Sequence, residues 1–310
     1  MKIIFTFPGQ GSQQPNMLHQ LPDYPVTQQF IQRASDALSE DVLTLDSQQA
    51  LQNTRAVQLC ILISGIVHAH LLKQAGIQAD FTSGLSIGAF PAAVFAGALN
   101  FEDAVRLVSL RGELMQHAYP HGYGLTSIQG LYQRQIEALV AQVHRDNNPA
   151  YIANFNDEDQ FVIAGSEAAM QQIAQLAGQL GARKSTRLAV SVPSHCALLQ
   201  VASEQLAQAM RQVTFQRPTL GYLSGNSARM VNDPAKIATD LANNMSHAVH
   251  WHDAMISAYE RGVRLAIEIP PGAVLTGLTK KMMPQGEAVS VCQTGLAATV
   301  ALSRTLTQLP

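Results

Sequence analysis

The sequence predicts an α/β protein in which a small α/β unit interrupts a larger one. Short apolar segments at residues 2–7 and 265–269 have the character of strands, and each leads into a turn that contains proline and glycine. Residues 54–73, 89–98 and 101–117 have the composition and apolar spacing of helices. The segment 122–190 instead follows a strand–helix–strand–strand–helix–strand order, which is typical of a ferredoxin-like unit.

The strongest chemical signal is the stretch Gly84-Leu85-Ser86-Ile87-Gly88, a Gly-x-Ser-x-Gly pattern. A short strand is expected before it and a helix after it, which is the context of a nucleophile elbow. Such a turn exposes the serine hydroxyl, and the flanking glycines avoid clashes that a Cβ would cause. The first N–H groups of the following helix offer donors to an oxyanion. A glycine-rich turn that merely contains serine is the alternative, so the interpretation depends on the rest of the chain.

Composition restricts the class of protein. The chain has 310 residues, 47% hydrophobic and 14% charged, which suits one large domain or two unequal ones. A formal net charge of -2 gives no general attraction to nucleic acid. The longest apolar run, 89–99, is too short to cross a bilayer, and the apolar N-terminus meets Pro8 too soon for a signal peptide. Three widely spaced cysteines favour a reducing compartment, so we expect a cytoplasmic protein with no membrane partner.

Arg111 is expected on the apolar side of the helix at 101–117. Its neighbours three and four residues away are Leu107, Val108, Leu114 and Met115. An arginine that faces inward needs an anionic partner, because burying its charge unpaired costs several kcal/mol. That partner is either a local carboxylate in a structural ion pair or a substrate carboxylate held by two parallel hydrogen bonds.

The inserted unit has its own elements. Strands are expected at 124–131, 150–154, 160–164 and 183–190, and helices at 133–144 and 167–180. We therefore predict a catalytic domain made of residues 1–121 and 191–310, with a small domain at 122–190.

His195 follows the last strand of the insert and precedes a helix. A helix N-terminus favours the neutral imidazole that a general base needs, whereas a loop or capping histidine is the alternative interpretation. Three further histidines, His247, His250 and His252, lie close together. No acidic or thiol ligand accompanies them at a usual spacing, so we expect no metal site.

The turn after the first strand contains Gly9-Gln10-Gly11. A dinucleotide-binding fingerprint needs a third glycine at position 14, which is Gln14. The backbone N–H groups of this loop are instead expected to serve a site at the carboxyl edge of the sheet.

Together these residues resemble the malonyl-CoA:acyl-carrier-protein transacylase family, almost from end to end. The family's N-terminal signature matches residues 7–13, its elbow residues 84–88 and its C-terminal motif residues 269–279. Arg111 matches the malonyl-binding arginine, and His195, within Val192-Pro193-Ser194-His195, matches the catalytic histidine. The resemblance implies an α/β-hydrolase-like main domain with a parallel sheet and a ferredoxin-like insert.

Three positions depart from the family pattern. Leu85 stands where a histidine usually precedes the nucleophile, and Ala89-Phe90 occupy a region that usually holds a glutamate. These two departures favour the malonyltransferase (epsilon) subunit of biotin-independent malonate decarboxylase. Asn244 replaces a glutamine that helps to orient the histidine. The exchange changes little if a backbone carbonyl makes that contact, and it alters the base if the side-chain amide makes it.

The resemblance implies an acyltransferase with no tightly bound cofactor. Ser86 attacks the thioester of malonyl-CoA while His195 takes its proton, and the N–H groups of Gln10 and Ile87 hold the oxyanion. Arg111 binds the malonyl carboxylate, with Leu85 beside it. No acidic third member is evident, so we predict a Ser–His dyad oriented by a carbonyl oxygen.

The implied acceptor is a pantetheine-type thiol on an acyl carrier protein. The main prediction is the carrier protein of malonate decarboxylase, whose other subunits are then further partners. The first alternative is a malonyl transacylase of fatty-acid or polyketide synthesis. The second alternative is a serine thioesterase or esterase that uses Asp157 or Asp159 as its acid. The third alternative is a non-catalytic subunit that binds carrier protein. A solvated surface is the expected setting for Arg183, Lys184, Lys280 and Lys281.

Overall fold

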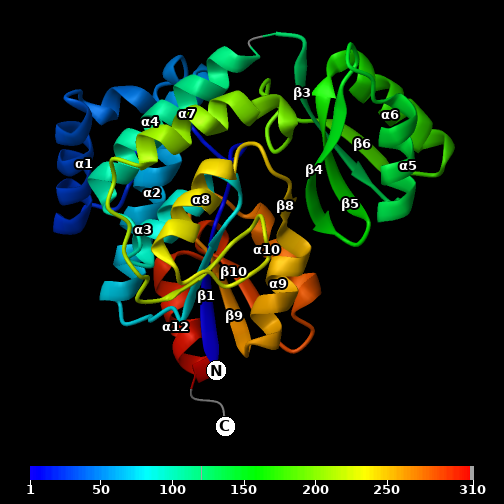
Figure 1. The fold of residues 1–310 in the computed structure, drawn as a ribbon. Helices are drawn as coiled ribbons and strands as arrows, with labels where there is room; N and C mark the ends of the chain where they lie inside the picture. Colours follow the sequence, from blue (N-terminus) through cyan, green and yellow to red (C-terminus); the bar gives the residue numbers. More distant parts are fainter. Residues whose placement is uncertain (120, 308–310) are drawn as a thin grey trace.

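The computed structural model describes residues 1–119 and 121–307, and it contains two β-sheets with helices packed around them (Figure 1). The larger sheet is parallel throughout, with strand order β10-β9-β1-β2-β7. It comprises β1 (Lys2–Phe7), β2 (Phe81–Gly84), β7 (Gly221–Leu223), β9 (Val263–Glu268) and β10 (Glu287–Ser290). This arrangement confirms the predicted α/β main domain with a parallel sheet.

β1 is the central strand of this sheet, and its residues from Ile3 to Phe7 are buried. A strand covered on both faces needs a continuous apolar run, which explains why residues 2–7 could be recognised from the sequence. β1 ends beside β2 through the pair Phe7 and Gly84, and beside β9 through Thr6 and Glu268. The loops that follow these three strands therefore meet at one edge of the sheet.

Helices surround the main sheet. They are α1 (Pro25–Leu38), α2 (Thr54–Gln74), α3 (Ala89–Phe95), α4 (Phe101–Ala118), α7 (Gln200–Met210), α8 (Pro234–Asn243), α9 (Trp251–Glu260), α10 (Val274–Met282), α11 (Val291–Thr294) and α12 (Leu296–Thr307). Short 3-10 turns occur at Val42–Asp46, Ala50–Gln52, Ser86–Gly88 and Ala197–Leu199. By length and composition α2 alone among the described helices would suit a membrane, but 83% of its most apolar window is buried inside the protein. It is therefore explained as a core helix.

The helix predicted at 89–98 is shorter than expected, because α3 ends at Phe95. Gly97 adopts a φ of 80°, and its N–H donates to the carbonyl of Val94 at 3.0 Å. The N–H of Ala98 donates to the carbonyl of Ala93 at 2.9 Å. Together these bonds form a glycine-based helix end, which the alanine-rich composition of the segment concealed.

The second sheet has the strand order β6-β3-β5-β4-β8 and lies beside the main domain (Figure 1). Its elements are β3 (Tyr123–Gln129), α5 (Gln133–Val143), β4 (Ala150–Asp157), β5 (Gln160–Ser166), α6 (Glu167–Gln179), β6 (Lys184–Arg187) and β8 (Val249–His250). The first four strands are antiparallel in the order fourth-first-third-second, which is the ferredoxin-like arrangement predicted from the sequence.

β8 comes from outside the segment 122–190 and pairs in parallel with β4. The ring of His250 stacks on Phe155 with centroids 4.6 Å apart. The small sheet is thus extended by a strand from the later part of the chain. The predicted boundaries at 121/122 and 190/191 stay a prediction.

The close packing between β1 and the elbow after β2 leads to a testable prediction. A Cβ on Gly88 would lie 2.1 Å from the carbonyl oxygen of Phe7, so Gly88→Ala must displace backbone. We expect this variant to lose roughly 3 kcal/mol of stability or to fail to fold. Gly277→Ala is the matched control: its Cβ meets nothing within 4 Å and it lies in helix α10, so it should gain up to about 1 kcal/mol. Thermal unfolding of both variants is the measurement, and an unchanged midpoint for Gly88→Ala would contradict the packing argument.

Candidate active site

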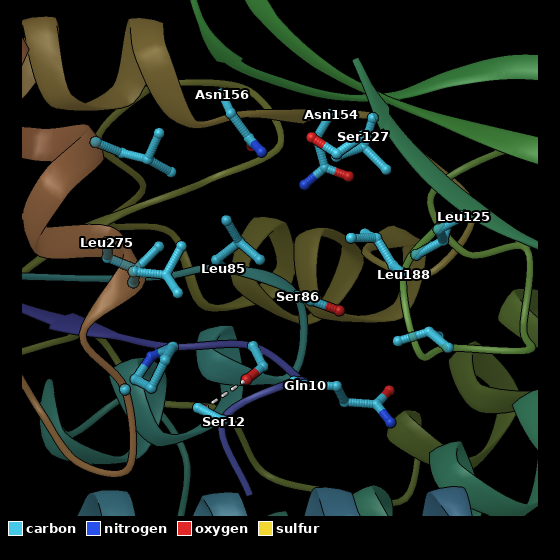
Figure 2. Close-up of a pocket in the computed structure, with 18 of the residues that line it drawn as sticks. Gln10, Ser12, Leu85, Ser86, Leu125, Ser127, Asn154, Asn156, Leu188 and Leu275 are labelled. Atoms are coloured by element: carbon cyan, nitrogen blue, oxygen red, sulfur yellow. Dashed lines mark hydrogen bonds between the residues drawn. The ribbon is translucent and has the colours of Figure 1, made fainter. Parts of the chain in front are cut away.

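A cleft of about 310 Å³ lies between the carboxyl edge of the main sheet and the small sheet. Figure 2 shows Asn154, Asn156 and Ser127 of the small sheet on one side of the cleft and Ser86 on the other. Gln10 lies beyond Ser86, on the loop that follows β1. The site is therefore built from both parts of the protein, as expected for a ligand bound beyond the ends of parallel strands.

The nucleophile elbow is held by backbone contacts. The N–H of Leu85 donates to the carbonyl of Phe7 at 3.0 Å, which ties the elbow to the end of β1. Ser86 itself adopts a φ of 56°, in the left-handed region that residues other than glycine rarely occupy. A Cβ on Gly84 would lie 2.0 Å from the backbone of Gly88, and a Cβ on Gly88 would lie 2.1 Å from the carbonyl oxygen of Phe7, so neither position accepts a side chain. The Gly-x-Ser-x-Gly pattern is thus a true elbow.

His195 has a left-handed backbone as well, with a φ of 65°. Its N–H donates to the carbonyl of Met245 at 2.7 Å, which fixes the turn. Its ring Nδ1 lies 2.7 Å from the carbonyl oxygen of Asn244, and its Nε2 lies 2.9 Å from Ser86 Oγ. A carbonyl oxygen only accepts, so Nδ1 carries the proton and Nε2 is free to accept the serine proton.

The imidazole is neutral at physiological pH. Burial, and secondarily the charge of Arg111, lower the pKa of His195 to about 4, although the hydrogen bond that the ring donates to the backbone carbonyl of Asn244 acts in the opposite direction. The sequence argument expected a neutral ring because of a helix N-terminus. That cause was wrong: an irregular turn and the 3-10 segment Ala197–Leu199 separate His195 from α7, and burial is the main reason.

Arg111 is fully buried on α4, as its apolar neighbours predicted. One terminal nitrogen donates to Gln58 Oε1 at 2.7 Å. The other donates to Asn244 Oδ1 at 2.9 Å and lies 3.4 Å from Ser86 Oγ. Arg106, on the solvent-exposed side of the same helix, instead forms an ion pair with Asp103 at 3.0 Å.

No carboxylate within the described part of the chain pairs with Arg111. Its Nε is also buried without a hydrogen-bond partner among the described residues. Burial lowers the pKa of Arg111 to about 9, which is still above neutral pH, so the guanidinium keeps its charge. The local ion pair that the sequence left open is therefore absent here, and the site contains a buried cation beside a nucleophile.

Asn244 has two separate contacts that settle how it holds the histidine. Its backbone carbonyl accepts from the ring of His195, and its side-chain oxygen accepts from Arg111. The histidine is thus oriented by the backbone, which is the case in which replacing a glutamine changes little for the base. The side chain matters for the guanidinium instead.

The two residues expected to hold the oxyanion flank the serine. Gln10 lines the cleft, and in residues 1–119 and 121–307 its backbone N–H donates no hydrogen bond to the protein. Ile87 follows Ser86 in the first turn of a 3-10 helix, where N–H groups lack partners within the helix. Leu85 lines the same cleft beside the serine.

Gln58 was not predicted as a site residue from the sequence, although its position on an apolar helix indicated such a role. It is a single amide in a stretch of α2 where its neighbours Ala56, Val57, Leu59 and Cys60 are all apolar and buried. Its oxygen accepts from Arg111, and its Nε2 donates to Gln10 Oε1 at 3.3 Å. A buried amide needs partners, so its presence on an apolar helix indicated a polar site nearby.

Glu268 was also missed, at the carboxyl end of β9. It lines the cleft, and its Oε2 accepts from the backbone and hydroxyl of Thr276 at 2.6 and 2.7 Å. It therefore caps the start of α10, and burial raises the pKa of its carboxyl group.

The acidic residues that a hydrolase triad would use lie elsewhere. Asp157 forms an ion pair with Lys281, and Asp159 pairs with Arg183 at 2.7 Å. Lys280 lies 3.9 Å from Glu287, so three of the four basic residues singled out in the sequence have acidic partners. Among the residues that the structure describes, no group of three or more metal-binding side chains occurs.

Comparisons with known proteins agree with this geometry. The family described as acyl transferase domain matches residues 4–299. The malonyl CoA-acyl carrier protein transacylase of Haemophilus influenzae is 36% identical over 297 residues, which cover 94% of this chain and 95% of that protein. The protein of the same name from Bacillus subtilis is 32% identical and covers 94% and 93%.

Solved structures give the same result. A malonyl CoA-acyl carrier protein transacylase from Coxiella burnetii superposes with a TM-score of 0.93 at 30% identity, covering 99% of this chain and 98% of the other. A malonyl-transacylase in complex with a type II PKS acyl-carrier protein has a TM-score of 0.90 at 33% identity, covering 97% and 99%. This chain is an acyltransferase and belongs to the malonyl-CoA:acyl-carrier-protein transacylase family.

Proposed function

We propose that this protein transfers a malonyl group from malonyl-CoA to the pantetheine thiol of an acyl carrier protein, through a malonyl ester on Ser86. The observation that carries the proposal is the buried guanidinium of Arg111, which is held by neutral amides 3.4 Å from Ser86 Oγ. An unpaired buried cation is costly, and a carboxylate at the far end of an acyl group would relieve that cost. Malonyl carries such a carboxylate, whereas acetyl does not.

In the first half-reaction Ser86 Oγ attacks the thioester carbonyl while its proton passes to Nε2 of His195. The carbonyl π electrons move to oxygen, where the N–H groups of Gln10 and Ile87 stabilise the charge. When the tetrahedral intermediate collapses, the C–S bond breaks and the CoA thiolate takes the proton back from His195. The products are free CoA and the malonyl-serine ester.

In the second half-reaction the carrier-protein thiol gives its proton to His195 and its sulfur attacks the ester. The bond from carbonyl carbon to Ser86 Oγ then breaks, and the serine recovers its proton. Two thiols therefore occupy the same position in turn, which gives ping-pong kinetics. No cofactor is required, because every proton and electron pair is returned within the cycle.

The acceptor is proposed to be an acyl carrier protein of fatty-acid or polyketide synthesis. The relatives named as malonyl CoA-acyl carrier protein transacylases, and the neighbour solved with a polyketide carrier protein, support this acceptor over the carrier protein of malonate decarboxylase. Leu85, which favoured the decarboxylase, lines the cleft beside the acyl site. Ala89 and Phe90 are buried in α3 and do not line the cleft, although the Phe90 ring centroid lies 5.9 Å from the guanidinium carbon of Arg111. Parallel assays with both carrier proteins distinguish the two acceptors.

The covalent intermediate gives the first functional prediction. Mixing the protein with malonyl-CoA should add one malonyl group to Ser86, detected by intact-protein mass spectrometry. Ser86→Ala should abolish the adduct, because no other hydroxyl contacts His195 Nε2 among the described residues. Ser12→Ala, which changes a second serine of the same cleft, is the control and should still be labelled. An adduct that survives Ser86→Ala would remove this serine from its role.

Donor selectivity gives the next prediction. Arg111→Met removes the charge and keeps a side chain of similar length, so kcat/KM for malonyl-CoA should fall about 10²–10³-fold, while that for acetyl-CoA should not fall. Arg106→Ala, on the exposed side of the same helix, should leave both values unchanged. Equal losses for the two donors in Arg111→Met would show that the arginine supports only the fold.

The pKa of His195 sets an expected pH dependence. Because the pKa of His195 is about 4, its imidazole is neutral and can accept a proton above that pH. The imidazole becomes protonated, and stops acting as a base, as the pH falls through about 4. The rate at which phenylmethylsulfonyl fluoride, a neutral reagent, inactivates Ser86 should therefore stay flat from pH 8 to 5 and decline near pH 4. Correction for hydrolysis of the reagent is the control. A midpoint near the ordinary histidine value of about 6.5 would contradict the buried, neutral base.

A further inference from the structure

We propose that Asn226 is a positioning residue for donor selectivity, which it controls by fixing the orientation of the Asn244 amide against Arg111; the inference rests on the proposed malonyl transfer. Asn226 lies on the loop after β7, outside every motif recognised in the sequence. It does not line the cleft with Ser86, so it acts through Asn244 and not on substrate.

The polarity of this contact follows from donors and acceptors alone. Arg111 only donates, so the Asn244 atom that faces it at 2.9 Å must be the amide oxygen. The amide nitrogen of Asn244 must then point the other way, where it donates to Asn226 Oδ1 at 3.2 Å. If Asn226 presented its own NH₂ group, two donors would face each other. The guanidinium therefore determines the orientation of both amides in series.

The remaining donor of Asn226 supports this reading. Its Nδ2 is buried and, within the described residues, has no hydrogen-bond partner. Leaving a buried N–H group unpaired costs roughly 1–3 kcal/mol. The side chain keeps this orientation because its oxygen is the acceptor that Asn244 needs. If the Asn226 amide rotated to find a partner for its Nδ2, Asn244 would lose its acceptor. The Asn244 amide could then rotate away from Arg111.

The loop that carries Asn226 is held by hydrogen bonds to Ser224, which itself bonds to Asp240. Ser224 Oγ accepts from the N–H groups of Asn226 and Ser227 at 3.2 and 3.0 Å, while its hydroxyl donates to Asp240. Asp240 also accepts from the hydroxyl of Tyr222 at 2.8 Å. The neighbouring Gly225 accepts from the N–H of His250 at 2.7 Å. Asn226 is thus a rigid support and can define where the Asn244 oxygen lies.

The two sides of the guanidinium are built alike. On one side Arg111 donates a hydrogen bond to Gln58, which donates to Gln10. On the other side Arg111 donates to Asn244, which donates to Asn226. Each series consists of neutral amides with the oxygen turned towards the cation. The arginine is therefore fixed in place without a carboxylate that would neutralise it, and its charge stays available to the acyl carboxylate.

The test compares Asn226→Leu with wild type, using malonyl-CoA and acetyl-CoA as donors. Asn226→Leu removes the acceptor for Asn244 and keeps a side chain of similar size. We expect kcat/KM for malonyl-CoA to fall about tenfold and that for acetyl-CoA to change less than twofold. Asn226→Gln retains a neutral amide oxygen and should return malonyl transfer to within about threefold of wild type. Ser227→Ala, an exposed position on the same loop, is the control.

A second comparison shows whether the effect passes through the arginine. In the Arg111→Met background, Asn226→Leu should cause no further change in the ratio of malonyl to acetyl transfer, because effects that act through one group are not additive. Equal losses for both donors, an unchanged ratio, or a further drop in the double variant would each overturn the inference. If the wild-type protein formed no malonyl-serine, the proposed function itself would be wrong. If the wild type were loaded normally and the Asn226 variants kept its donor selectivity, only the inference about Asn226 would be wrong.

Discussion

The buried charge of Arg111 is the constraint on which the rest of the site depends. A guanidinium removed from water normally requires a carboxylate, and here its partners are the amides of Gln58 and Asn244. These neutral partners accept hydrogen bonds from its two terminal nitrogens without cancelling its charge. The free protein therefore has an unneutralised cation beside Ser86, and in the proposed function the carboxylate of a dicarboxylic thioester becomes its partner.

The fold brings the reactive groups together through backbone contacts. Ser86 is tied to the end of β1 because Leu85 bonds to Phe7, and His195 is tied to the segment after α8 through Met245 and Asn244. Both reactive residues have a left-handed backbone, at φ values of 56° and 65°. Such conformations cost about 1–3 kcal/mol each and persist only where surrounding contacts enforce them. Ser86 and His195 are thus two of the five non-glycine residues with a left-handed backbone among the described residues.

Much of this arrangement could be predicted from the sequence, because local patterns carry it. Residues 3–7 are buried and form one apolar run, and the spacing of apolar residues around Arg111 predicted that it faces inward. Gly84 of the elbow is required by contacts within five residues, whereas Gly88 is required by the distant backbone of Phe7 and Pro8. What could not be predicted depends on long-range hydrogen bonds. Nothing near Asn226 in the sequence indicates that it supports Asn244, eighteen positions later.

Within residues 1–119 and 121–307 no carboxylate contacts the ring of His195, and the same buried charge explains why. A carboxylate on Nδ1 of His195 would lie close to Arg111, because Asn244 contacts both the imidazole and the guanidinium. It would raise the pKa of the histidine and at the same time attract the guanidinium as a permanent counter-ion. The substrate carboxylate would then compete with a residue of the protein. A backbone carbonyl orients the ring and fixes its tautomer without adding a charge. A Ser–His dyad is therefore compatible with the proposed function, in which Arg111 has to remain available to substrate.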